Sequence, residues 1–210
     1  MLVDLTHPVY PGMPVYPGDS EVDFETEHSY DSAGYRVTEV TLNTHAGTHI
    51  DAPSHYSADG ITVDADAILS ACVGTAIVVD IGNRPAGAEI TPPDLGSALN
   101  SVGEGDRLLL ASGWSGMFGS EGFFGDFPSI SKELALTLAG RSIALIGVET
   151  PSLHTEYDET IHRILLSAGI VIVESLANLR LLGEGRVFFS AAPLRLKGLD
   201  GSPVRAYGIR

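Results

Sequence analysis

The chain has 210 residues, of which 44% are hydrophobic, enough to bury the core of one domain. Its 27 acidic and 12 basic residues give a net charge of −15, which argues against nucleic acid or an anionic membrane surface as a partner. The only cysteine, Cys72, excludes an intrachain disulfide and a thiolate metal cluster. Because neither a signal peptide nor an apolar run of about 18 residues is visible, we expect a single cytoplasmic domain over residues 1–210.

In the first part of the chain, a short apolar strand is expected over residues 1–5. A stiff loop follows at 8–19, and its apolar residues, Tyr16 among them, are candidates for a pocket wall. Alternating apolar residues then predict two half-buried strands, one near Val22 and Phe24 and one over 35–44. The second strand leads into the segment 45–55.

The rest of the chain mixes strands and helices without strict alternation. Apolar runs and capping signals predict strands at 72–81, 107–111, 143–148, 170–173, 187–191 and 204–209, and helices at 65–70, 91–102, 131–138, 158–167 and 176–182. This order favours an α+β fold, a three-layer β/β/α (swivelling-type) single domain with a mixed sheet, over a doubly wound fold. The loop at 112–128 is rich in glycine and aromatic residues, which is typical of a lid or binding loop but also of a passive cover for the core.

The segment from His45 to His55 carries three histidines and one aspartate within eleven residues. Gly47 and Pro53 oppose a helix, so we expect His45 at a strand end, a kink at Gly47, and His49 and Asp51 on the following turn. Three nitrogen and oxygen ligands leave coordination positions open, as in a catalytic metal site. The alternative is a set of hydrogen-bonded surface groups, which would require four separate coincidences.

Two further residues have chemistry that the sequence alone leaves open. Glu174 follows four β-branched residues, at the carboxyl end of a buried strand, where it is either a turn residue or a metal ligand. His162 lies beside the apolar stripe of the helix at 158–167 and is either a hydrogen-bonded boundary histidine or a ligand.

The pattern His-x-Gly-Thr-His-x-Asp-x-Pro-x-His, as residues 45–55 read, resembles the signature of the cyclase-like metal-dependent hydrolases. That family includes bacterial kynurenine formamidase and isatin hydrolase. The resemblance extends to the stretches 4–7, 16–19 and 201–205. It implies that His45, His49 and Asp51 hold one divalent ion, that Asp51 and Glu174 bridge to a second, and that His162 completes the second site.

The same resemblance implies the reaction. One or two ions, zinc or manganese, would lower the pKa of bound water, and the hydroxide would attack an amide-type carbonyl with His55 as general acid/base. The expected substrate is an aryl formamide such as N-formylkynurenine. Tyr16 departs from the tryptophan typical of formamidases and, as a smaller ring that also donates a hydrogen bond, suits a different or more polar substrate than kynurenine. The alternative substrate is a cyclic amide such as isatin, or a lactone.

Two other classes of protein compete with a metal-dependent hydrolase as interpretations of the sequence. A serine hydrolase is disfavoured, because neither Ser112 nor Ser115 lies in a nucleophile elbow. A metal-dependent small-molecule binding protein without turnover stays open, and the role of His55 discriminates it from an enzyme. The expected partners are a small-molecule substrate and further copies of the chain in a homodimer or homotetramer, as the resemblance implies, with no nucleic acid and no membrane.

Overall fold

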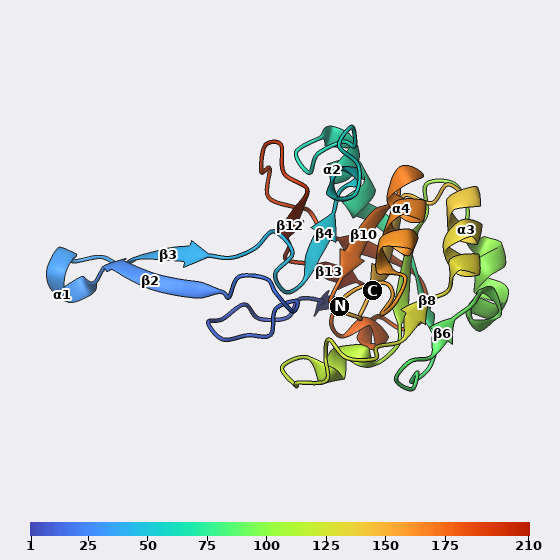
Figure 1. Cartoon of the computed structure of the whole chain (residues 1–210), viewed down its shortest axis with the longest axis horizontal. Helices are drawn as coiled ribbons and strands as arrows, with labels where there is room; N and C mark the ends of the chain where they lie inside the picture. The colour runs from blue at the N-terminus through green and yellow to red at the C-terminus, as the bar shows by residue number, and fades with distance from the viewer.

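The computed structural model describes residues 1–210, and its centre is a nine-stranded mixed sheet (Figure 1). The neighbouring strands β5, β7, β9 and β10 are parallel, and the strands on either side of them pair antiparallel. In sheet order the strands are β1 (Leu2–Asp4), β13 (Tyr207–Ile209), β11 (Gly185–Ser190), β5 (Val73–Asp80), β7 (Arg107–Ala111), β9 (Leu145–Val148), β10 (Val171–Glu174), β4 (His49–Asp51) and β12 (Gly201–Pro203).

Side-chain alternation along β5 divides the hydrophobic core into two clusters, one on each face of the sheet. Val78 belongs to the first and its neighbour Ile77 to the second. The first cluster also contains Val3 of β1 and Ile50 of β4, which lie toward opposite ends of the sheet, so the sheet curls around it. The second cluster is covered by α3 (Lys132–Gly140) and α4 (Asp158–Ser167). The predicted α+β fold with a mixed sheet and a β/β/α arrangement is confirmed.

The remaining elements are short and connect the strands of the sheet. They are α2 (Asp66–Cys72), the two-stranded pair β6 (Glu89–Ile90) and β8 (Ser129–Ile130), and the 3₁₀ helices η1 (Pro53–His55), η2 (Pro92–Ser101), η3 (Trp114–Met117) and η4 (Leu179–Leu182). Cys72, predicted at the start of a buried strand, ends α2 instead and is buried there. No helix is both long and apolar enough to cross a membrane.

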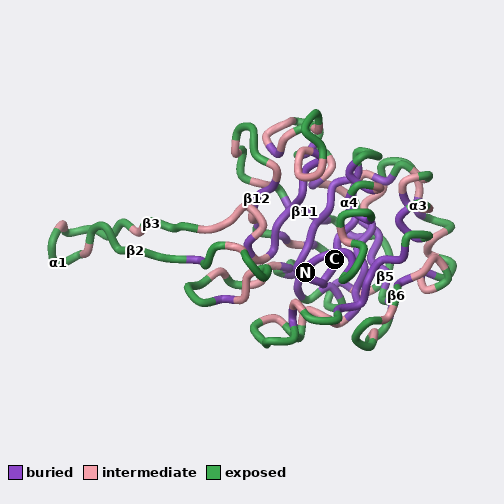
Figure 2. The backbone as a smooth tube through the Cα atoms, viewed as in Figure 1, coloured by how far each residue is buried: buried purple, intermediate pink, exposed green.

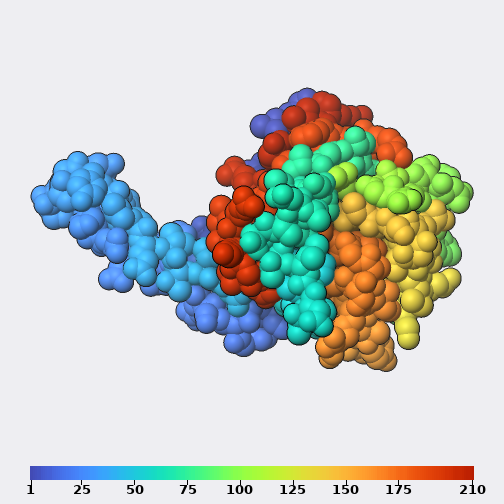
Figure 3. Space-filling view, turned by 90° about the horizontal axis from the view of Figure 1, so that it is seen from above, coloured from blue at the N-terminus to red at the C-terminus, as the bar shows by residue number.

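A hairpin arm, made of β2 (Asp23–His28), α1 (Tyr30–Ala33) and β3 (Val37–Thr41), projects from the body of the molecule (Figures 1 and 3). Every residue of β2 is exposed, and only Thr38 of β3 is partly covered. Figure 2 shows the arm in green beside the purple centre of the sheet. The two strands were predicted, but their predicted half-burial is wrong, because alternation defines two faces without showing that anything covers either of them.

Three predicted elements differ from the structure. The helix expected at 91–102 is η2, which is interrupted at Gly96 by a φ of +51°. The helix expected at 176–182 is only η4, because Ser175 and Asn178 have left-handed φ angles of +54° and +57°. The strand expected at 204–209 is the shorter β13, and β12 precedes it without having been predicted.

Candidate metal centre and active site

The segment 45–55 enters the sheet through a turn at Gly47, whose φ is +64°. A Cβ atom at this glycine would lie 3.2 Å from Met13 Cε, so the close approach of the loop also favours glycine. Strand β4 follows and pairs with β10 on one side and β12 on the other. The predicted kink is confirmed, but the placement around it was wrong. His45 lies in the turn, whereas His49 and Asp51 lie on β4. Pairing with β10 and β12, which are distant in the chain, holds this segment in the extended conformation.

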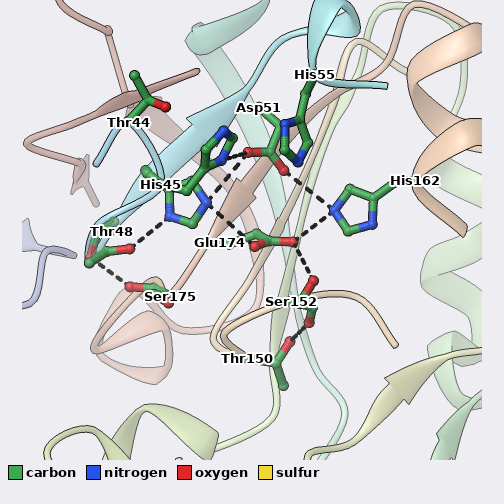
Figure 4. A network of polar contacts seen from close by, with 12 residues as sticks. Thr44, His45, Thr48, Asp51, His55, Thr150, Ser152, His162, Glu174 and Ser175 are labelled. Carbon is green, nitrogen blue, oxygen red and sulfur yellow. Dashed lines mark hydrogen bonds and ion pairs between the residues drawn. The ribbon is translucent and has the colours of Figure 1, made fainter. Parts of the chain in front are cut away.

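The pairing of β4 with β10 brings the predicted ligands together. His49 and Asp51 are two residues apart and lie on the same face of β4, and Glu174 is the β10 residue directly opposite His49. His162 approaches from α4, and His45 from the turn before β4 (Figure 4). We call His45, His49, Asp51, His162 and Glu174 the donor cluster. Three elements and a turn therefore deliver five ligand-type side chains to one place.

Asp51 lies at the centre of the donor cluster and faces imidazoles with both oxygens (Figure 4). Its Oδ1 is 2.7 Å from His45 Nδ1 and 3.4 Å from His49 Nε2, and its Oδ2 is 3.4 Å from His162 Nε2. Glu174 Oε1 lies 3.2 Å from His162 Nε2, and Glu174 Oε2 lies 3.5 Å from His49 Nε2. The donor atoms thus form two groups of three that share Asp51, and within each group all lie within 4.8 Å of one another.

The orientation of these groups fits metal ligands. Both Asp51 oxygens are buried and make no aligned hydrogen bond despite the nearby nitrogens. The second nitrogen of each imidazole has an oxygen partner: His45 Nε2 is 2.9 Å from Asp200 Oδ2, His49 Nδ1 is 2.8 Å from the Gly47 carbonyl, and His162 Nδ1 is 2.9 Å from the Asp158 carbonyl. Such outer contacts hold an imidazole so that one nitrogen faces an ion.

The electrostatics of the donor cluster point in the same direction. Burial lowers the pKa of His49, but the Asp51 and Glu174 carboxylates outweigh it and raise that pKa to about 10. Burial opposes ionisation of Asp51, whereas the imidazoles of His162 and His45 hold its pKa well below the usual value. No lysine or arginine lines the pocket. Ionised carboxylates here need positive charge close by, which either protonated imidazoles or a metal cation can supply.

His55 lies at the edge of the donor cluster, on η1. Its ring centroid is 4.1 Å from that of His45, and its Nδ1 is 3.4 Å from Asp200 Oδ2. Asp200 therefore contacts the Nδ1 side of the ring and not Nε2. Burial lowers the pKa of His55, the largest of several opposing effects. Asp200 therefore contacts both a predicted ligand and the predicted acid/base. Sequence reasoning missed Asp200, because nothing in its local sequence separates it from an ordinary turn aspartate.

A pocket of about 350 Å³ is lined by all seven candidate site residues of the sequence analysis, among others. They are His45, His49, Asp51, His55, His162, Glu174 and Tyr16. Four aromatic residues also line this pocket: the ring centroids of Tyr16 and Phe124 are 5.9 Å apart in an edge-on contact, and that of Phe123 lies 5.1 Å from Phe124 and 5.2 Å from Phe118. We call Tyr16, Phe118, Phe123 and Phe124 the aromatic wall. Three of these four residues belong to the loop 112–128, so this loop lines the pocket of its own chain.

Comparison with solved structures supports a metal-dependent hydrolase fold. A structure described as a "potential metal-dependent hydrolase with cyclase activity" is 30% identical, with a TM-score of 0.81, and the match covers 99% of this chain and 96% of that one. Isatin hydrolase A from Labrenzia aggregata, bound to benzyl benzoate, is 27% identical, with a TM-score of 0.87 and coverage of 99% and 93%. A predicted metal-dependent hydrolase from Bacillus stearothermophilus is 29% identical, with a TM-score of 0.82 and coverage of 99% and 97%.

The family assignment comes from the sequence itself. The model of the Cyclase family, described as "Putative cyclase", matches residues 3–155. These residues include the whole segment 45–55, and the structural matches extend the likeness over the remaining part of the chain, with His162 and Glu174. The chain belongs to the Cyclase family.

Proposed function

We propose that this protein is a metal-dependent hydrolase that cleaves an amide-type C–N bond in a small aromatic substrate. The observation that carries the proposal is the Asp51 carboxylate, whose two buried oxygens face three imidazole nitrogens without an aligned hydrogen bond. A purely structural polar cluster would pair these oxygens. The names of the similar structures support metal-dependent hydrolysis as the type of reaction.

The donor cluster can hold one or two divalent ions, zinc or manganese, since imidazole and carboxylate ligands suit these metals. His45, His49 and Asp51 would hold the first ion, and Asp51, His162 and Glu174 the second. When bound, such an ion supplies Lewis-acid chemistry, which polarises a carbonyl oxygen and makes water acidic enough to lose a proton near pH 7.

The chain's own residues supply the proton transfer and the orientation. In our proposal, His55 Nε2 accepts the proton of the attacking water and passes it to the leaving nitrogen. Asp200 holds the opposite nitrogen of the same ring at 3.4 Å. Ser152 Oγ lies 2.8 Å from Asp158 Oδ1 and 3.2 Å from Glu174 Oε1, so its single proton is shared between these two carboxylates and restrains Glu174 from the side away from Asp51.

The lining of the pocket favours one substrate type over the other. N-formylkynurenine carries an α-carboxylate beside an α-ammonium group, and although the acidic lining could bind the ammonium, none of the lining residues is a lysine or arginine that could pair with the carboxylate. Asp19, Asp158 and Asp200 instead add negative charge around the donor cluster. A neutral aromatic cyclic amide, such as isatin, needs no such partner and can stack against the aromatic wall. We therefore favour an uncharged aromatic cyclic amide and keep the aryl formamide as the second candidate.

A substrate panel tests this proposal. Purified protein, loaded separately with Zn²⁺ and with Mn²⁺, is assayed with isatin, N-formylkynurenine, formanilide and an aryl lactone. We expect hydrolysis of isatin, and of formanilide in preference to N-formylkynurenine, whereas hydrolysis of the lactone alone would contradict cleavage of a C–N bond. Preference for N-formylkynurenine would contradict the charge argument. Failure of the whole panel with metal bound would favour the binding protein without turnover.

We also propose that the chain forms a homodimer through the hairpin arm. A two-stranded hairpin is marginally stable by itself in water, and this arm exposes Phe24, Tyr30, Tyr35 and Val40. An exposed arm with apolar side chains is suited to covering a second copy of the chain. Light scattering should give the mass of a dimer, and deletion of residues 23–41 with a two-residue Gly linker should give a monomer. A monomeric full-length chain would refute the proposal.

A further inference from the structure

Glu149 is a fully buried carboxylate that the proposed chemistry does not use. It follows β9 directly and is 1% exposed. No arginine, lysine or histidine forms an ion pair with it, and its partners are instead hydrogen-bond donors from two other segments. A buried carboxylate is costly unless its oxygens are fully paired, so the position requires an explanation.

The contacts of Glu149 concentrate on the residues just after β7. Glu149 Oε2 accepts hydrogen bonds from the backbone N–H groups of Ser112 at 2.9 Å and Gly113 at 2.6 Å. Glu149 Oε1 accepts one from Ser115 Oγ at 3.1 Å, and a longer one at 3.4 Å from the backbone N–H of Leu179 in η4. Gly113 has a left-handed φ of +79°, which turns two successive N–H groups toward the carboxylate. The carboxylate therefore fixes the first residues of the loop 112–128.

The anchored residues continue directly into the aromatic wall. Trp114 follows Gly113, and its Nε1 donates a hydrogen bond to the Phe123 carbonyl at 3.0 Å. Phe118 lies between Trp114 and Phe123 in the chain, and its ring stacks on that of His7 with the two centroids 3.9 Å apart. Residues 112–115 thus determine where the loop starts, and the Trp114 bond determines where it returns to the pocket.

We propose that Glu149 is a positioning residue that sets substrate affinity by anchoring the aromatic wall, an inference that rests on the proposed function. Glu149 is not among the residues that line the pocket, so it acts through the loop and not on the substrate. Its removal should displace Phe118, Phe123 and Phe124 and leave the donor cluster in place, because β4, β10 and α4 hold four of the five candidate ligands independently of the loop.

Glu149→Gln is the informative variant, because it keeps the size of the side chain and changes only its hydrogen bonding. Each carboxylate oxygen accepts from at least one backbone N–H group. Either orientation of the glutamine amide therefore points an NH₂ group at an N–H donor. Ser115→Ala is the milder variant, since it removes one contact and leaves the carboxylate buried with its backbone partners.

The test combines kinetics with the fluorescence of Trp114, which is the only tryptophan in the chain. On the best substrate of the panel, we expect Glu149→Gln to raise KM by about tenfold with kcat within about twofold, as for lost binding without lost chemistry, and Ser115→Ala to raise KM by about threefold. Acrylamide quenching of Trp114 should increase in both variants. Glu133→Gln, on the exposed surface of α3, is the control and should match the wild type.

The outcomes separate the two proposals. Unchanged KM and unchanged Trp114 quenching in folded Ser115→Ala and Glu149→Gln would overturn the anchoring role, as would a fall in kcat with KM unchanged. If the wild type hydrolyses nothing in the panel, the proposed function fails. In that case the anchoring role of Glu149 is tested by measuring the binding of isatin to the Mn²⁺-loaded protein through Trp114 emission. Weaker binding by the variants supports the anchoring role, and equal binding refutes it.

Discussion

The donor cluster and the aromatic wall line one pocket, but they are held in different ways. Four of the five donors come from strands of the central sheet or from α4, and the fifth lies in the turn that leads into β4. The wall comes from two loops, one around Tyr16 and one at 112–128, which a few polar anchors hold. A site on regular elements keeps its geometry, whereas loops tolerate change. The difference suggests that the cluster determines the reaction and the wall determines the substrate.

The largest effect is expected at Asp51, the residue shared by both groups of candidate ligands. Asp51→Asn removes the charge of the central carboxylate, so we expect loss of bound metal and a fall in kcat of at least about a thousandfold. Elemental analysis and the panel assay measure both effects. Treatment of the wild type with a chelator should give the same loss, and re-addition of metal should restore only the wild type. Asp59→Asn, in an exposed loop, is the control. Full metal content and activity in Asp51→Asn would remove it from the metal centre.

His55 separates metal binding from proton transfer within the same side of the pocket. His55→Ala should keep its metal, since His55 lies outside both groups of ligands that contain Asp51. Its kcat should fall by about a hundredfold to ten-thousandfold, the usual range for loss of a general acid/base. Glu133→Gln, on the exposed surface of α3, should match the wild type. Equal rates in His55→Ala and wild type would exclude His55 from the mechanism.

A substitution at Asp200 tests how far the outer contacts of the donor cluster contribute to metal affinity and to kcat. Its Oδ2 is 2.9 Å from His45 Nε2 and 3.4 Å from His55 Nδ1. Asp200→Asn keeps the shape but weakens both contacts, so we expect metal affinity or kcat to fall by about tenfold to a hundredfold. Competition with a chelator and steady-state kinetics measure the two effects. An unchanged metal affinity together with unchanged kcat would show that the imidazoles hold their orientation without Asp200.

The donor cluster was accessible from sequence because its signals are local. His45, His49, Asp51 and His55 lie within one short segment, and His162 and Glu174 sit on a periodic helix and a continuous apolar strand, respectively. The helix at 158–167 and the strand at 107–111 match their predicted bounds for the same reason. Even so, the pattern could not show that His49 and Asp51 lie on a strand, because the strands that pair with them are far away in the chain.

The supports of the pocket were not accessible, because their partners are distant in sequence and carry no motif. Asp200 meets His45 across 155 residues, and Glu149 meets Ser112 across 37. An aspartate before a glycine and a glutamate after a strand are common, so neither stands out until the fold brings its partners close. The same limit explains the arm, whose alternating residues suggested a buried face that the structure leaves open.

The smallest expected effect concerns the support behind the aromatic wall, where His7 stacks on Phe118 and its Nε2 is buried without a hydrogen-bond partner. Burial lowers the pKa of His7 to about 4. Since the unfolded chain binds this proton near pH 6.5 and the folded chain does not, stability should fall as the pH drops from about 6.5 to about 4. We expect about 1–2 kcal/mol from His7, after allowance for its partial exposure. Urea unfolding of chelator-treated His7→Phe and wild type at several pH values isolates this contribution, because the other titrating groups cancel. The stability difference should therefore grow toward pH 4 in favour of His7→Phe, whereas a constant difference would mean that water reaches this imidazole and that the wall is open behind Phe118.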